Sequence, residues 1–256
     1  MSKKLSDEER RRRLALVVRA EQTAFTAAMA AVMPDAIAAR DDISEASKQE
    51  TRIYAACWQA LAEAAMRELF AAIAASGRRR PPRGREAVRR WAGVDEDTRE
   101  RAFREAMDRQ AGEDSPDTAK RLALAAMAQC AAIRAEQAEE RSALLLGRVR
   151  PFEEALERFE KMYRRECDLS VPGDGALLRP ILAATGGADI GPDDFEASAD
   201  ALRDLGQCHQ RAAEAHRAIA QAMRDDGAAE DATTLEWVGV DAETYERALD
   251  RALGEA

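Results

Sequence analysis

The amino-acid sequence predicts an all-α protein: duplicated helical hairpins packed as a pseudo-twofold bundle of four long helices plus two short capped helices. Three observations support this prediction: abundant alanine with only 5% aromatic residues, long stretches with apolar residues at helical spacing, and a repeated motif. Alanine has the highest helix propensity and is poor in strands. Its small side chain also lets backbones approach closely, so we expect a core of closely packed helices.

The repeated motif occurs once from Trp91 and again from Trp237. Both copies read W-x-G-V-D-x-x-T-x-E-R-A, a match long enough to indicate an internal duplication. In each copy the aspartate is an N-cap acceptor and the threonine follows three residues later, so a short helix is expected to begin there. The two indoles could clamp a ligand, but buried indoles are usually packing anchors, and we favour that interpretation.

The duplication divides the chain, interpreted as a single all-helical domain 1–256, into two repeats. The first repeat covers residues 8–112 and the second covers residues 115–256, with an insertion at about 151–192. In each repeat two long helices are followed by a loop, the tryptophan turn and a short helix. Because each hairpin has an apolar face that it cannot bury alone, the two repeats are expected to pack together.

The first repeat begins with a long helix predicted over about 8–33, which Pro34 kinks or ends. The apolar positions that follow helical spacing include Leu14, Val18, Phe25, Met29 and Val32. The next helix, about 43–75, has two adjacent apolar rows, which indicate a central helix with neighbours on several sides. A predicted loop over 78–90 follows, and the Trp91 motif begins directly after it.

The second repeat begins with a long helix predicted over about 117–146. Gly147 and Pro151 mark a kink or break, after which an amphipathic pattern continues. The following segment is rich in glycine and proline and is interpreted as irregular. The last long helix is predicted over 194–224, and a polar loop leads from it to the Trp237 motif.

Two shorter matches extend the duplication beyond the motif. Residues 19–22 recur as residues 134–137, and the pattern of residues 57–64 recurs in residues 208–215. This alignment pairs Tyr54, Trp58, Leu61 and Ala65 with Leu205, His209, Ala212 and His216, respectively. The apolar faces of the two halves are therefore expected to correspond.

The candidate small-ligand site is a pocket between the repeats, formed by Glu21, Glu136, Trp58, His209 and His216. Both glutamates lie near apolar stripes and suit a buried salt bridge or a polar ligand contact. The histidines are seven residues apart on one helix, about 10.5 Å, which is too far for one metal ion. We interpret them as core or boundary residues. No Glu-x-x-His motif is present to complete a di-iron site, so no metal is predicted.

The arginines of the 78–90 segment are the sharpest departure from the acidic mean of the chain. Guanidinium groups suit phosphates and carboxylates. The candidate partner-binding residues are Arg78, Arg79, Arg80, Arg83, Arg85, Arg89 and Arg90. A solvated loop is the other interpretation. The corresponding segment of the second repeat, 225–231, is acidic, so docking of one copy's basic loop onto another copy's acidic loop would build an oligomer.

Composition narrows the function classes. A net charge of −9 with 34% charged residues indicates an acidic soluble protein and argues against wholesale coating of nucleic acid. Four dispersed cysteines without a C-x-x-C pair favour a reducing cytoplasm. No stretch of about 18 residues lacks charge, so no membrane span is expected. Nucleophile-elbow, phosphate-loop and metalloprotease motifs are absent, so no catalytic residue and no cofactor are predicted.

Three functional hypotheses remain open. The leading one is a non-catalytic cytoplasmic helical interaction or scaffold protein, possibly self-associating, with a protein partner or a second copy as the partner. The second is a binder of an anionic partner, a nucleic acid or an acidic protein, through the Arg78–Arg90 loop. The third is a helical-bundle enzyme or small-ligand binder with its site between the repeats.

Overall fold

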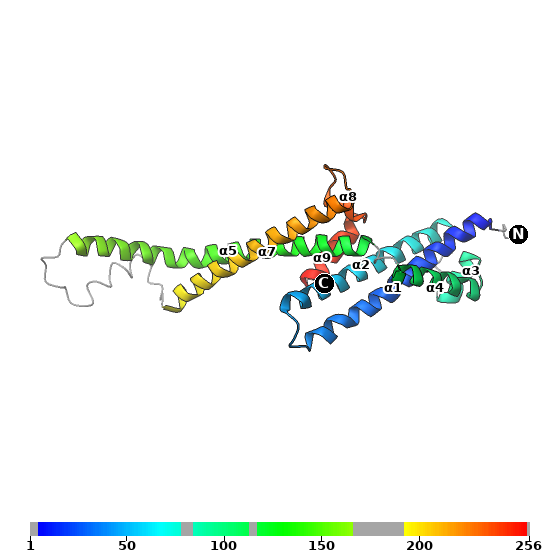
Figure 1. Cartoon of the computed structure of the whole chain (residues 1–256), viewed down its shortest axis with the longest axis horizontal. Coiled ribbons are helices and arrows are strands. Elements are labelled where there is room, and N and C mark those ends of the chain that lie inside the picture. Colours follow the sequence, from blue (N-terminus) through cyan, green and yellow to red (C-terminus); the bar gives the residue numbers. More distant parts are fainter. Residues whose placement is uncertain (1–4, 78–83, 113–116, 166–191, 255–256) are drawn as a thin grey trace. The chain divides into compact units, whose positions relative to one another are not determined.

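The computed structural model describes residues 5–77, 84–112, 117–165 and 192–254, and these residues form helices with no strand among them (Figure 1). This confirms the predicted all-α class and helical-bundle packing. The chain divides into two compact units: a larger unit, Met1–Cys130 with Arg217–Ala256, and a smaller unit, Ala131–His216. No helix within the described ranges combines the length and apolar character that a membrane span requires.

Helices α1 (Asp7–Ala38) and α2 (Glu45–Ala75) form an antiparallel hairpin, which is the framework of the larger unit (Figure 1). Each helix begins after a serine whose hydroxyl oxygen accepts a backbone N–H of the first turn, at 3.1 Å for Ser6 and 3.2 Å for Ser44. Helix α1 continues through Pro34, so this residue does not end the predicted helix.

Helices α3 (Arg85–Ala92) and α4 (Glu96–Gly112) pack on α1. The predicted loop over residues 78–90 is wrong for the part that α3 includes. Arginine, glutamate and alanine have good helix propensity, and α3 places Val88 and Trp91 against the α1–α2 core. Burial of these two side chains stabilises a helix that is too short to form alone.

Helices α5 (Asp117–Arg165) and α7 (Pro192–Asp225) are the other two long helices. Helix α5 continues through Gly147 and Pro151, so these residues do not end the helix and a predicted break there is wrong. Val149 lies between them and is buried, and its burial offsets the poor helix propensity of glycine and proline. The rest of the predicted insertion lies outside the described residues.

Helices α8 (Thr234–Val238) and α9 (Ala242–Leu253) contain the second copy of the motif, and α9 packs on α2. Two arginines of α9 hold one carboxylate of α2. Glu63 accepts from Arg247 at 3.0 Å and from Arg251 at 2.5 Å. A helix from the end of the chain is thus fixed to the central helix of the first repeat.

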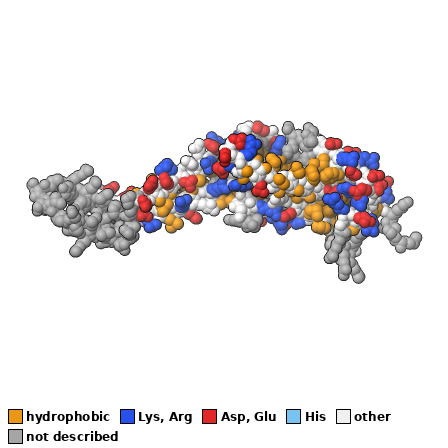
Figure 2. Space-filling model, turned by 90° about the horizontal axis from the view of Figure 1, so that it is seen from below, with side chains coloured by type: hydrophobic (Ala, Val, Ile, Leu, Met, Phe, Trp, Pro, Cys, Tyr) orange, Lys and Arg blue, Asp and Glu red, His pale blue; other side chains and the backbone are white. Residues whose placement is uncertain are grey.

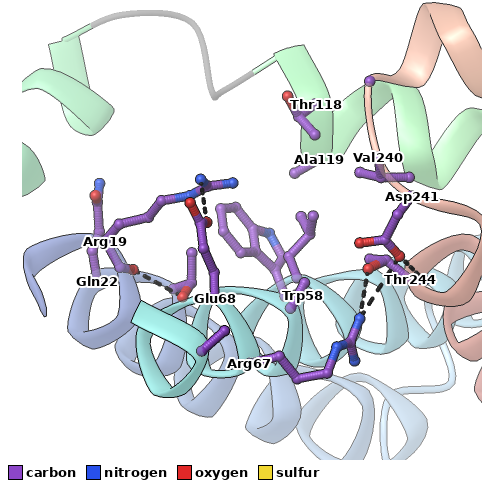
Figure 3. Close-up of a pocket in the computed structure, with 15 residues that line it drawn as sticks. Arg19, Gln22, Trp58, Arg67, Glu68, Thr118, Ala119, Val240, Asp241 and Thr244 are labelled. Carbon is purple, nitrogen blue, oxygen red and sulfur yellow. Dashed lines mark hydrogen bonds and ion pairs between the residues drawn. The ribbon is translucent and has the colours of Figure 1, made fainter. Parts of the chain in front are cut away.

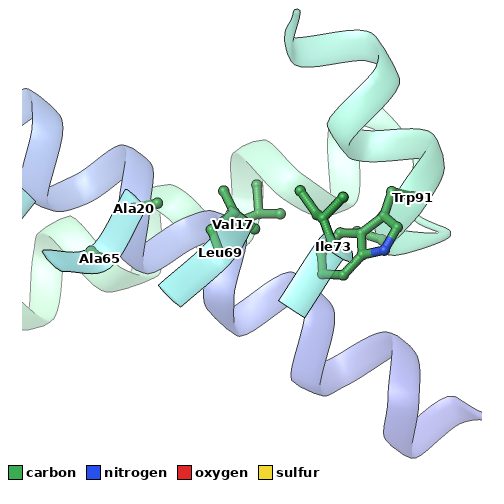
Figure 4. Packing of buried hydrophobic residues seen from close by; sticks show 7 residues of the cluster. Val17, Ala20, Ala65, Leu69, Ile73 and Trp91 are labelled. Atoms are coloured by element: carbon green, nitrogen blue, oxygen red, sulfur yellow. The ribbon is translucent and has the colours of Figure 1, made fainter. Parts of the chain in front are cut away.

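The hairpin core near the first tryptophan combines small and large apolar side chains (Figure 4). Its buried members are Val17, Ala20, Ala65, Leu69, Ile73, Trp91 and Ala92. The alanines let α1 and α2 approach closely, and the indole closes the end of the core. A second buried cluster, Ala27, Ala30, Ala55, Trp58 and Ala119, joins the start of α5 to the same hairpin.

The two motif copies have the same turn. Each tryptophan lies in the last turn of a short helix, where the sequence predicted only a turn. The glycine that follows is left-handed in both copies, with φ 71° at Gly93 and 76° at Gly239. The predicted caps are confirmed. Asp95 accepts the N–H three residues on at 2.8 Å, and Asp241 does so at 2.7 Å.

Each tryptophan also makes the same set of contacts with the two long helices of its predicted repeat. The indole N–H of Trp91 donates to Ser76, the residue that follows α2, at 3.0 Å. The indole N–H of Trp237 donates to Asp226, the residue that follows α7, at 2.8 Å. Two arginines, Arg13 of α1 and Arg121 of α5, lie over the rings and donate to the tryptophan carbonyl oxygens, at 2.8 Å and 3.3 Å.

These contacts change the alignment of the repeats. Arg13 and Arg121 each begin the sequence Arg-Leu-Ala-Leu, a match that differs from the alignment of residues 19–22 with 134–137 by about two helical turns. The predicted face correspondence is wrong as well, since Trp58 is buried whereas its counterpart His209 is exposed. The correspondence of Ser76 with Asp226 differs by one residue from the alignment that pairs Trp58 with His209. A shift of one residue rotates a helix face by about 100°. Duplication of the complete hairpins stays a prediction.

Candidate functional site

The larger unit contains a pocket of about 560 Å³ (Figure 3), which we name the Trp58 pocket. Small-molecule sites typically measure about 300–1,000 Å³. Helices α1 and α2, the start of α5 and the second motif copy supply its walls. Apolar walls come from Trp58, Leu61, Ala64, Ala71, Ala119 and Val240. Polar side chains come from Arg19, Gln22, Arg67, Glu68, Asp241 and Thr244.

Three acceptor side chains of the Trp58 pocket accept hydrogen bonds from groups of the chain itself. Glu68 accepts from Arg19 at 2.8 Å. Asp241 accepts the backbone N–H of Thr244 at 2.7 Å, and this bond is the main reason why the pKa of Asp241 is lowered. The hydroxyl oxygen of Thr244 accepts in turn from Arg67 at 3.0 Å.

Two donor atoms of the Trp58 pocket make no hydrogen bond with any described residue. The Trp58 side chain is 2% exposed, and its indole N–H meets no acceptor among the described residues. Nη1 of Arg67 is also buried without a hydrogen bond, since Glu243 is 3.7 Å away. Leaving a buried donor unsatisfied costs about 1–3 kcal/mol. The other two tryptophans both have acceptors, so the unpaired Trp58 is the exception.

The five residues of the predicted inter-repeat pocket are divided between the two compact units. Trp58 lines the pocket described above, whereas Glu21 pairs with Arg99 of α4 at 2.5 Å in a partly buried salt bridge. Glu136, His209 and His216 belong to the smaller unit and are exposed. The interpretation of both histidines as core or boundary residues is therefore wrong. A joint site of all five residues stays a prediction.

The arginine-rich segment is only partly described. Arg78, Arg79, Arg80 and Arg83 lie outside the described residues. Of the remaining three, Arg85 is exposed, Arg89 pairs with Glu96, and Arg90 lies 3.8 Å from Glu86. In the acidic segment, Asp226 is already bound by Arg121 and Trp237. Binding of an anionic partner by the arginines stays a prediction.

One face of α1 carries an exposed apolar stripe, which we name the α1 stripe. Its members are Phe25, Met29, Val32 and Met33, which are 50%, 59%, 65% and 51% exposed. The sequence pattern places the first three on an apolar helix face. The ring of Phe25 meets the ring of Phe103 of α4 edge to face, with centroids 6.3 Å apart. Figure 2 shows hydrophobic side chains gathered over this side of the larger unit.

A groove of about 740 Å³ adjoins the α1 stripe, and Phe25 borders both. Helices α1 to α4 form this groove, whose apolar lining includes Met66, Leu69, Phe70, Val88 and Phe103. The same side of the larger unit therefore presents the exposed apolar stripe and a groove whose lining also includes the charged residues Glu21, Arg85, Arg99 and Glu100.

The described residues contain no group of three or more His, Cys, Asp or Glu side chains arranged to hold a metal ion. No disulfide joins the three described cysteines: Cys57 and Cys130 are buried, and Cys208 is partly exposed. Burial, with a smaller contribution from Cys130, raises the pKa of Cys57 to about 12. A thiol with this pKa remains protonated and unreactive near neutral pH.

Alkylation tests this environment. With iodoacetamide at about pH 8, we expect Cys208 to be labelled in the native protein and Cys57 to be labelled only after denaturation. The neutral Cys57 thiol stabilises the fold fully below the pKa of the unfolded thiol. This contribution is lost as the pH rises toward 12, because the unfolded state releases the proton first. Peptide mapping by mass spectrometry identifies which cysteines iodoacetamide has alkylated. Rapid labelling of Cys57 in the native protein would show that this residue is not buried.

The Trp58 pocket was only partly visible in the sequence. The sequence indicates Trp58 through its alignment with His209. It indicates Asp241 and Thr244 through the repeated motif. Nothing in the local pattern around Arg67 indicates that it reaches Thr244 on α9, because this contact joins residues far apart in the chain. No protein family, curated protein or solved structure matches this chain.

Proposed function

We propose that this chain is a non-catalytic helical interaction protein that binds a second copy of itself through the α1 stripe. The supporting observation is the exposure of four large apolar side chains on neighbouring turns of one helix. Contiguous exposed apolar patches of this kind mark interaction surfaces, whereas single exposed apolar residues do not. The absence of a disulfide among the three described cysteines is consistent with a cytoplasmic location.

A second copy is the favoured occupant because of the chemistry and shape of the patch. Residues 22–34 contain no charged side chain, so this part of α1 cannot select a partner by opposite charge. A twofold axis would place the α1 stripe of one copy in the groove beside the α1 stripe of the other copy. Such an interface uses the same patch on both subunits. The two α1 helices would then run antiparallel, which also opposes their dipoles favourably.

Sedimentation velocity over a concentration series tests this proposal. We expect the wild-type protein to approach the mass of a dimer as its concentration rises, and the double variant Met29→Glu/Val32→Glu to remain a monomer. Leu144→Glu is the matched control, since Leu144 is 72% exposed and lies outside the stripe. This control should associate as the wild type does.

Circular dichroism of the three proteins shows whether each keeps its helix content. The proposal is wrong if the wild-type protein remains a monomer at every concentration. It is also wrong if the folded double variant forms dimers as tightly as the wild type, because two buried carboxylates would oppose the proposed interface.

A further inference from the structure

We propose that the Trp58 pocket binds a small organic carboxylate with an apolar body. This site is separate from the α1 stripe, and the inference does not depend on self-association. It depends on two features of the described residues: the unsatisfied donors of the pocket and the apolar character of the walls between them.

The hydrogen bonds of the pocket leave two buried donor atoms without an acceptor. The carboxylates of Glu68 and Asp241 already accept hydrogen bonds, from Arg19 and from the backbone of Thr244. Among the described residues, the buried indole N–H of Trp58 has no acceptor, and Nη1 of Arg67 makes no hydrogen bond but lies 3.7 Å from Glu243 in an ion pair. A ligand that supplies oxygen acceptors would satisfy these two donors.

The location of Trp58 makes its donor relevant to the cavity. Figure 3 shows its indole extending from α2 into the space between Glu68 on one side and Val240 on the other. Trp91 and Trp237 are equally part of the core, yet each donates to a side-chain oxygen of the chain. Trp58 is therefore the indole that finds no acceptor within the described part of the chain and also lines a pocket.

Charge and wall composition limit the class of ligand. A cation would add donors or positive charge beside Arg19 and Arg67, where the unsatisfied groups are already donors. A doubly charged phosphate would face Glu68 and Asp241 in the same walls. The Arg67 guanidinium lies 3.8 Å from Asp241 and 3.7 Å from Glu243, beyond hydrogen-bond distance, so it can still donate to a single ligand carboxylate. An apolar chain or ring suits the walls formed by Leu61, Ala64 and Val240.

Nuclear magnetic resonance can test this proposal directly, because each of the three tryptophans gives its own indole N–H signal. The probes are hexanoate, 3-phenylpropionate and 3-benzoylpropionate, with the corresponding amides as uncharged controls. We expect at least one carboxylate to shift the Trp58 signal saturably while the Trp91 and Trp237 signals remain in place. The amide of that probe should bind more weakly.

Variants then assign the contacts. Trp58→Phe keeps a ring in the wall but removes the N–H, and Arg67→Gln removes the positive charge. Each change should weaken binding about tenfold, measured by calorimetry, as expected for the loss of a hydrogen bond to a charged group. Arg52→Gln is the control, because Arg52 is exposed on α2 away from the pocket.

The proposal is overturned if no probe shifts the Trp58 signal saturably, or if binding is unchanged in both pocket variants. Self-association is tested separately. Met29→Glu/Val32→Glu should bind the probe with the affinity of the wild type, so failure of one proposal leaves the other intact. If Trp58→Phe unfolds, Arg67→Gln and the indole titration of the wild type still decide the outcome.

Discussion

Replacement of Trp91 by alanine is expected to lower the free energy of unfolding by about 3–5 kcal/mol. Trp91 is among the largest fully buried side chains, and it packs with Val17 and Ile73 in the hairpin core (Figure 4). The substitution removes the indole–Ser76 hydrogen bond and the ring under Arg13. It also leaves a cavity at the junction of three helices, which the rigid backbones cannot close.

Urea unfolding followed by circular dichroism measures this effect. Trp91→Phe is the control that keeps a buried ring while removing the N–H, and it should lose a smaller part of the stability. If Trp91→Ala unfolds at the same urea concentration as the wild type, the tryptophan is not the anchor that its burial indicates.

Replacement of Leu122 by alanine is expected to cost about 2–5 kcal/mol. Leu122 is fully buried on the part of α5 that belongs to the larger unit, among alanines such as Ala119 and Ala126. The alanines beside it on α5 are small and cannot extend into the space that the lost methyl groups leave. The cavity therefore persists and adds to the lost burial of apolar surface.

Leu144→Ala is the matched control for this second experiment. Leu144 lies on the same helix but is 72% exposed, so its replacement should change the free energy of unfolding by no more than about 0.5 kcal/mol. The same urea titration compares both variants with the wild type. Equal effects at the two positions would contradict the burial assigned to Leu122.

The local features of the fold could be predicted from the sequence. Helical spacing identified the long helices, and the Asp-x-x-Thr pattern identified the caps at Asp95 and Asp241, because both signals depend on neighbouring residues. Helix α3 and the continuity of α5 at Pro151 could not be predicted. In both places burial by distant elements overrides a local preference for a turn or a break.

The candidate site was less predictable than the fold. Periodicity shows that Met29 and Val32 share a helix face, but it does not show whether another helix covers that face. In the Trp58 pocket, the bond between Arg67 and Thr244 joins α2 to a helix near the end of the chain. The identity of the two residues gives no sign of this bond, since it arises from helix packing.

The contacts of Trp91 also affect how the hairpin opens. Its indole is held by the residue after α2, and its carbonyl oxygen by an arginine near the start of α1. The other end of the hairpin is closed by the short connection between Ala38 and Glu45. We therefore expect the two helices to open together at the Trp91 end. Opening at Trp91 would release both termini together, which makes the hairpin a single cooperative unit in hydrogen exchange.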